Sequence, residues 1–116
     1  MDISVEWTNP SGAVLAAAVL GLNMAAEHLL AASQELSPVD SGDNRRSAAV
    51  QEATVNDPVA WVTYGMPYSV RIHEATDMNF STVKNPKAQA KFLETPLVRD
   101  RAELVGLIQA SIRRVL

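Results

Sequence analysis

Apolar and polar residues follow two periods along this chain, that of a strand and that of a helix. Ile3, Val5 and Trp7 alternate with polar neighbours, which predicts a half-buried strand over residues 2–8. Over residues 12–36 the apolar positions recur every three or four residues, which predicts one long helix. Its predicted buried stripe consists of Val14, Leu15, Ala18, Leu22, Ala25, Ala26, Leu29, Leu30 and Leu36.

A polar segment, residues 37–47, follows this helix and is predicted to be a loop. Pro38 disfavours helical geometry at the residue before it, so the helix should end there. Asp40 can hydrogen-bond nearby backbone amides, and Gly42 can adopt a positive φ. The chain can therefore reverse direction in this segment. On composition alone it is a solvated connection between a helix and a strand.

Short alternating segments come after the loop. They predict strands over residues 48–55, 59–64 and 68–73, separated by turns at residues 56–58 and 65–67. Because short turns join consecutive antiparallel strands, these segments predict a meander, to which the N-terminal strand can add. The expected sheet has three to four strands.

The last third of the chain is predicted to return to helix. Residues 74–85 lack a period and predict an exposed loop, and residues 86–94 predict a short helical turn. Thr95 as N-cap and Pro96 in the first turn predict a helix over residues 96–115. The predicted fold class is α+β: one domain, with a long N-terminal helix and a C-terminal helix packed on a small antiparallel sheet.

Charge is divided unevenly along the chain. Residues 1–44 contain six acids and no Lys or Arg, a charge of −6, whereas residues 45–116 contain ten bases and seven acids, a charge of +3. A subunit polarised in this way can pack head to tail on copies of itself. The alternative is that the two parts neutralise each other within one molecule.

The composition excludes several classes of protein. The chain has no cysteine, which excludes disulfides and thiolate metal sites. The most apolar run, residues 13–22, is too short to span a membrane, and acids stand where a signal peptide needs bases. A net charge of −3 argues against general nucleic-acid binding. We expect a soluble protein without a membrane partner.

Few residues have the spacing of a catalytic or metal site. The sequence contains no glycine-rich phosphate loop and no Gly-x-Ser-x-Gly elbow, so neither an enzyme nor a cofactor is expected. His28 and His73 could join Glu74 and Asp77 as ligands of a small metal-dependent hydrolase if the long helix crossed the end of the last strand. Otherwise both histidines are ordinary polar residues at the surface.

Four short motifs stand in an order that is found in a known family. They are Ser-Pro-Val-Asp-Ser-Gly at residues 37–42, Arg-Arg-Ser at 45–47, the segment 68–74 ending in His-Glu, and Lys-Phe-Leu-Glu at 91–94 before Pro96. This order resembles the small neck proteins of long-tailed bacteriophages, described as minor capsid, head-to-tail joining or tail-completion proteins. The resemblance covers residues 24–116.

The resemblance implies a structural virion protein that catalyses no reaction. It would be assembled in the host bacterial cytoplasm as a homo-oligomeric ring in the phage neck, between the portal or head connector and the tail. Its partners would be copies of itself, portal-adaptor and tail proteins, with passive contact to translocating DNA. Asn44 departs from the family pattern, which usually has an apolar residue there. A generic oligomerising binding module is the alternative.

Two groups of residues are candidates for function. Met78 and Phe80 are apolar residues in a polar segment, so residues 74–85 either contact a partner or place Phe80 in the protein's own core. The predicted structural loop residues are Pro38, Asp40, Gly42, Arg45, Arg46 and Ser47. The predicted partner contacts are Tyr68, His73, Glu74, Met78, Phe80 and Phe92.

Overall fold

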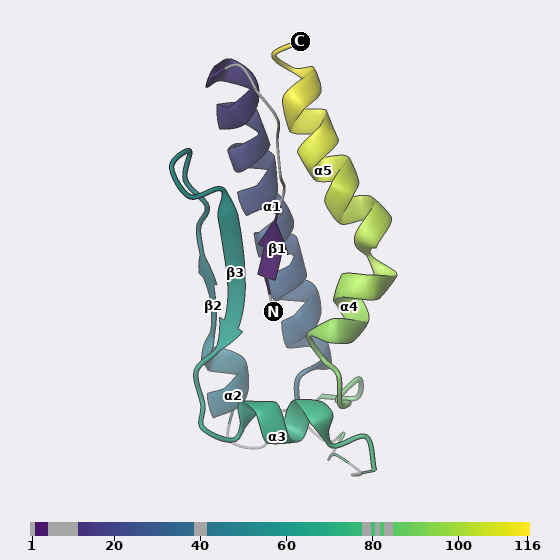
Figure 1. The fold of residues 1–116 in the computed structure, drawn as a ribbon. Helices are drawn as coiled ribbons and strands as arrows, with labels where there is room; N and C mark the ends of the chain where they lie inside the picture. Colours follow the sequence, from purple (N-terminus) through teal and green to yellow (C-terminus); the bar gives the residue numbers. More distant parts are fainter. Residues whose placement is uncertain (1, 5–11, 39–41, 78–79, 81, 83–84) are drawn as a thin grey trace.

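Helix α1 (Gly12–Leu36) extends along most of the molecule, and most other elements pack on it (Figure 1). The bounds predicted for this helix are confirmed. With about 1.5 Å of rise per residue its length is roughly 37 Å, which is most of the 48 Å long axis of the molecule. The computed structural model describes residues 2–4, 12–38, 42–77, 80, 82 and 85–116.

The fold mixes helix and sheet, with a long N-terminal helix and a C-terminal helix, as predicted. One side of α1 packs on a small antiparallel sheet and another side packs on the C-terminal helices (Figure 1). The other described elements are β1 (Asp2–Ser4), α2 (Asp43–Arg46), β2 (Ala48–Gln51), β3 (Val59–Tyr64), α3 (Ser69–Glu74), α4 (Glu94–Arg99) and α5 (Arg101–Arg113).

The meander is smaller than predicted, because it supplies only a two-strand antiparallel sheet. Strands β2 and β3 form an antiparallel pair in which Val50 lies opposite Val62. The three-residue β1 pairs with the other edge of β3, with Ile3 opposite Ala60, so the strand order is β1-β3-β2. Both edges of β3 are therefore occupied.

One strand prediction is shortened, one is confirmed, and one is described only in part. The strand predicted over residues 48–55 ends at Gln51. The strand predicted over residues 59–64 is β3. Of the strand predicted over residues 2–8, the part from residue 5 onward lies outside the described residues.

Residues 68–73, predicted to be a strand, form the helix α3 instead. A third strand of the meander would have to pair with β3 on the edge where β1 already pairs with residues 59–61. The helix turns Ser69 inward, where it is 5% exposed, and leaves Val70 75% exposed. This is the reverse of the burial that the alternating pattern predicted.

The helix predicted over residues 96–115 begins earlier and is divided in two. Asp100, with φ −99° and ψ 13°, separates α4 from α5. Leu93, not Thr95, is the N-cap residue of α4. Pro96 is the third residue of α4, where the N–H that proline lacks would have no partner inside the helix. The predicted helix is therefore correct in type but not in its start or its continuity.

The connecting segments also differ from their predictions. The loop predicted over residues 37–47 contains α2, although residues 39–41 lie outside the described residues. In the segment predicted as a loop, residues 74–85, Glu74 is the last residue of α3. The turn predicted over residues 86–94 becomes helical only at its last residue.

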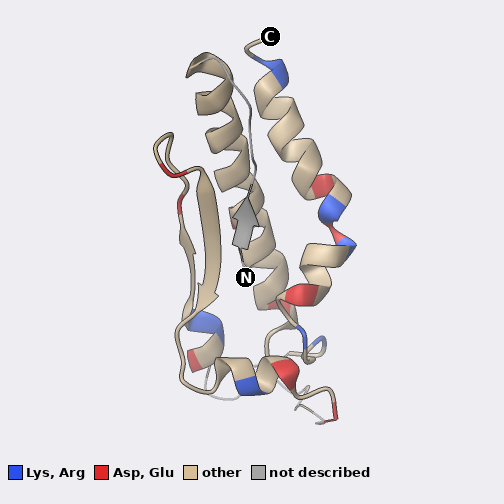
Figure 2. Cartoon of the chain, in the orientation of Figure 1, with Lys and Arg blue, Asp and Glu red and all other residues tan. Residues whose placement is uncertain are grey.

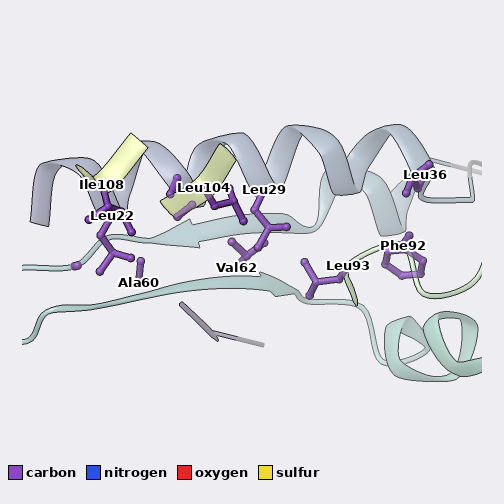
Figure 3. Packing of buried hydrophobic residues seen from close by; sticks show 12 residues of the cluster. Leu22, Leu29, Leu36, Ala60, Val62, Phe92, Leu93, Leu104 and Ile108 are labelled. Carbon is purple, nitrogen blue, oxygen red and sulfur yellow. The ribbon is translucent and has the colours of Figure 1, made fainter. Parts of the chain in front are cut away.

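The hydrophobic core lies along the inner face of α1 (Figure 3). Leu22 lies near Ile108 and Ala60 at one end of this face, and Leu29 lies near Leu104 and Val62 farther along (Figure 3). The predicted stripe is largely confirmed, because Ala18, Leu22, Ala25, Ala26, Leu29 and Leu36 are buried.

Gly21 allows α1 and α5 to approach each other closely. A Cβ atom at Gly21 would lie 2.7 Å from the Cα atom of Ile108 and 2.9 Å from the Cβ atom of Ser111. Next to this contact the Ser111 hydroxyl donates a 2.7 Å hydrogen bond to the carbonyl of Ala17. The absence of a side chain at Gly21 thus determines how near the two helices lie.

By length and composition α1 would also meet the requirements of a membrane span, with a mean hydropathy of 1.6 over its most apolar window. In this fold its polar residues bond to the rest of the domain. The amide of Asn23 donates to the carbonyl of Ala53 at 3.1 Å, and the Ser33 hydroxyl lies 2.6 Å from that of Tyr64. These contacts are those of a core helix in a globular domain.

The Gly21 contact predicts opposite effects for two glycine substitutions. Gly21→Ala should lower the free energy of unfolding by up to about 2 kcal/mol, because overpacking costs about 1–3 kcal/mol and the gain in helix propensity returns about 1. Gly106→Ala is the control, since a Cβ atom at Gly106 meets nothing within 4 Å, and it should raise the stability by about 0.5–1 kcal/mol. Urea denaturation measures both, and an equal gain in the two variants would contradict the packing at Gly21.

Candidate functional site

The motifs of the resemblance meet at one end of the molecule, around a buried polar network. Asn44 of α2 is 4% exposed. Its amide nitrogen donates to the Ser37 hydroxyl at 2.8 Å, and its amide oxygen accepts from the Ser69 hydroxyl at 2.6 Å. Asn85 donates to the Ser37 carbonyl at 2.8 Å. One small network therefore joins the end of α1, α2, α3 and the segment before α4.

The residues predicted to form the structural loop have separate local roles. Gly42 adopts the positive φ that was expected, 85°, immediately before α2. The carbonyl of Arg45 accepts a 3.0 Å hydrogen bond from Gln34 of α1, and the Ser47 hydroxyl donates to the Asn44 carbonyl at 2.6 Å. Arg46 is exposed and pairs with Asp43. Pro38 is half-buried, and Asp40 lies outside the described residues.

A pocket of about 360 Å³ opens beside this network, between β3, α3 and residues 92–93. Phe92 forms part of its wall and is 1% exposed. The Phe92 ring packs edge-on against Tyr64, with centroids 4.9 Å apart, and against His73, with centroids 5.0 Å apart. Burial raises the pKa of Tyr64, although its hydrogen bond with Ser33 opposes this effect. The pocket is lined mainly by apolar atoms.

Lys91 directs Phe92 into the core. It has a φ of 55°, a left-handed value that is uncommon for a residue other than glycine. Its backbone N–H donates to the His73 carbonyl at 2.7 Å, and its ammonium group pairs with Glu74 and with Glu94. The Lys91 ammonium, and after it His73, hold the pKa of Glu74 below its usual range.

The predicted partner contacts divide into exposed and buried residues. Tyr68 is 38% exposed, and the carboxylate of Glu74 is also exposed. His73 and Phe80 are half-buried. Phe92 belongs to the core and supports the pocket from within, and Met78 lies outside the described residues.

His73 already uses both ring nitrogens. Its Nε2 atom accepts a 3.2 Å hydrogen bond from the backbone N–H of Glu94, so the ring proton is on Nδ1, which lies 3.0 Å from a carboxylate oxygen of Glu74. The ring thus connects α3 to α4. It has no nitrogen left for a metal ion in this arrangement.

His28 lies in a different cluster, between α1 and the junction of α4 and α5. Its Nε2 atom is 3.3 Å from a carboxylate oxygen of Asp100 and 3.6 Å from one of Glu103. The Arg99 guanidinium donates to both Asp100 oxygens, at 2.8 and 3.0 Å. Hydrogen bonds from Arg99, and to a smaller extent from His28, hold the pKa of Asp100 below its usual range.

The predicted metal ligands do not come together. Among the described residues, the group of three whose ligand atoms lie within 4.8 Å of one another is His28, Asp100 and Glu103. His73, Glu74 and Asp77 are not part of it. Sequence reasoning missed Asp100 because its nearness to His28, 72 positions earlier in the chain, is a product of packing.

The ion pairs of Lys and Arg form mostly within the C-terminal part of the chain. Arg46 pairs with Asp43, Lys91 with Glu74 and Glu94, and Arg99 with Asp100. No ion pair joins Glu27 or Glu35 of α1 to a Lys or Arg in the part of the chain that is described. Among the described acids of residues 1–44, Asp43 pairs directly with a base of the C-terminal part, whereas Glu27 and Glu35 do not.

Comparisons with protein-family models, curated proteins and solved structures found no match.

The polar network predicts a specific weakness at Asn44. Asn44→Ala should lower the free energy of unfolding by about 2 kcal/mol or more, because it leaves two buried serine hydroxyls without their partner. Asn56→Ala, in an exposed turn, is the control and should change stability by less than about 0.5 kcal/mol. Chemical denaturation of both variants measures the difference. Equal stability of the two variants would show that Asn44 does not hold this end together.

The lowered pKa of Asp100 predicts a pH-dependent effect. A carboxyl group with a lowered folded-state pKa stabilises the protein above the unfolded pKa of about 3.9, and this contribution is lost as the pH falls through the folded pKa. Asp100→Asn should therefore cost about 1 kcal/mol at pH 7, and the difference from the parent protein should close below about pH 4. Glu52→Gln, at an exposed position, is the control at pH 7. A difference that stays constant with pH would contradict this role of Asp100.

Proposed function

We propose that this protein is a structural component of a bacteriophage neck, where its copies form a ring that joins the portal or head connector to the tail. The order of the sequence motifs supports this assignment. Three of the segments that carry the resemblance, residues 45–47, 68–74 and 91–94, lie at one end of an elongated subunit (Figure 1). The polar network and the Lys91 contacts give that end a defined shape for contact with a neighbour.

The observation that carries the proposal is the apolar surface left uncovered on both long helical segments. Leu20 and Met24 of α1 are 56% and 41% exposed, and Val98 and Val105 of the C-terminal helices are 69% and 43% exposed. Uncovered apolar residues that recur along one helix are typical of a surface that binds another protein. A ring of identical subunits covers two such surfaces on every copy.

The distribution of charge agrees with a place around DNA. Helix α1 has no Lys or Arg, and its half nearer the N-terminus has no charged residue (Figure 2). Such a surface does not hold a phosphate backbone. In the proposed neck, DNA passes with only passive contact, and the lasting partners are copies of this chain and the portal-adaptor and tail proteins.

The two alternatives have less support. A metal-dependent hydrolase was expected to use His28 with His73, and these residues lie in separate clusters with no shared partner. A generic oligomerising module would use the same uncovered surfaces. Its gene would not stand beside portal, adaptor and tail genes, as the phage proposal requires.

Loss of the gene tests the proposal in a phage that carries it. We expect filled heads and separate tails in electron micrographs, because the joining ring is missing, and a plasmid copy should restore joined particles. Mass spectrometry should find the protein in purified virions and in multiple copies in solution. Normal particles without the protein, or a protein that is monomeric and absent from virions, would reject the neck assignment.

A further inference from the structure

Exposed residues along α1 form a stripe that changes from apolar to acidic along the helix. Positions 13, 16, 20, 24 and 27 are all exposed and recur every three or four residues, so they share one face of the helix. The first four are Ala13, Ala16, Leu20 and Met24, and the fifth is Glu27. We call these five residues the α1 stripe. It is apolar over about three turns and then becomes acidic.

A second stripe follows the C-terminal helices. Ala102, Val105 and Gln109 of α5 are exposed and recur every three or four residues, and Val98 of α4 is exposed on the other side of the junction at Asp100. Arg101, one position before Ala102, is exposed beside them. We call these five residues the C-terminal stripe. It too is largely apolar. Two exposed charged residues flank Ala102: Arg101 is basic, and Glu103 is acidic but lies 3.6 Å from His28 of its own subunit.

The two stripes lie at matching heights along the molecule. Gly21 is level with Ile108, since a Cβ atom at Gly21 would lie 2.7 Å from the Cα atom of Ile108. The helices run in opposite directions (Figure 1), and both rise about 1.5 Å per residue. Met24 is therefore level with Val105.

Contacts on either side confirm this register. Ser111 bonds to Ala17, and His28 contacts Asp100 and Glu103. In the same register, Glu27 lies level with residues 101–102 of the C-terminal helices.

We propose that the α1 stripe of one copy packs on the C-terminal stripe of the next copy, an inference that rests on the proposed ring. Rotation about an axis parallel to α1 leaves every residue at its own height, so each stripe meets the other in the register just described. Met24 then faces Val105 of the neighbouring copy, and Glu27 faces Arg101. The apolar residues exclude water from the contact, and the opposite charges fix its direction.

Charge favours this occupant over the others. If two α1 stripes faced each other, Glu27 of one copy would lie near Glu27 of the other, or it would have no basic residue opposite it. Within the described part of the chain, neither Glu27 nor Arg101 forms an ion pair inside the subunit. Small residues at positions 13, 16 and 102 allow two helices to approach at the usual interaxial distance of about 8–10 Å.

The absence of cysteine allows a direct test. We expect the double variant Met24→Cys with Val105→Cys, oxidised or treated with a short bismaleimide, to give a ladder of covalent dimers, trimers and larger species on a denaturing gel. Each single variant should remain monomeric on that gel, and a mixture of the two single variants should stop at dimers. Both positions are half-exposed, so neither change should unfold the protein.

Controls separate this contact from other arrangements. Met24→Cys with Arg71→Cys, which moves the second cysteine to α3, should give no ladder. Cross-linking of Met24→Cys alone would show that α1 packs on α1 of another copy and would overturn the inference. Binding of the monomer to phosphatidylcholine vesicles through the α1 stripe would overturn it in favour of a membrane surface.

A charge exchange tests the direction of the contact. Glu27→Arg or Arg101→Glu alone should shift the native mass distribution toward monomer by several-fold at equal protein concentration, and the double variant should restore oligomers. Arg71→Glu, an exposed position on α3 that belongs to neither stripe, should leave the distribution unchanged. Oligomers that form without the Met24–Val105 ladder would reject this interface and leave the neck proposal standing, whereas failure to find oligomers in solution or in virions would reject both.

Discussion

The burial of one face of α1 is the interaction on which the rest of the structure depends. The sheet packs on this face from one side and α5 packs from another, so both are held chiefly by the same helix. Burial of apolar area is the dominant favourable term in folding. The alanines and Gly21 allow the neighbours to come close, and Leu22 and Leu29 fill the space between them. The helix thus packs against the sheet on one side and against α5 on another.

The end of the molecule beyond α1 is organised by hydrogen bonds more than by apolar area. Asn44, Ser37, Ser69 and Asn85 are all buried, and each has a partner. Loss of one member of such a network destabilises the fold, because a buried polar group is left without a hydrogen-bond partner. The network therefore selects one arrangement of α2, α3 and the segment before α4.

The proposed assembly uses the two faces of α1 for different purposes. The inner face completes the fold of the subunit, and the outer face leaves an apolar stripe that a monomer would expose to water. The C-terminal helices are divided in the same way, with Leu104 and Ile108 inside and Val105 outside. Because the same pair of helices sets the register within the subunit and presents both outer stripes, the fold determines the register of the proposed contact between subunits.

The sequence alone determined the elements whose pattern is long and regular. The bounds of α1, the strand β3 and the presence of a C-terminal helix follow from local preference repeated over many residues. The positive φ of Gly42 follows from the residue type itself. The resemblance also directed attention to segments that do meet in the fold.

Tertiary structure decided the secondary structure of the short segments and the contacts between distant residues. A short segment has too few residues for its local preferences to determine whether it becomes helix or strand. Residues 68–73 alternate like a strand, yet β1 pairs with part of the edge of β3 that they would need, and Ser69 gains a buried partner as part of a helix. The pairing of His28 with Asp100, and the inward position of Phe92, depend on contacts between distant parts of the chain. Such contacts leave no periodic signal in the sequence, since only the packed chain brings their members together.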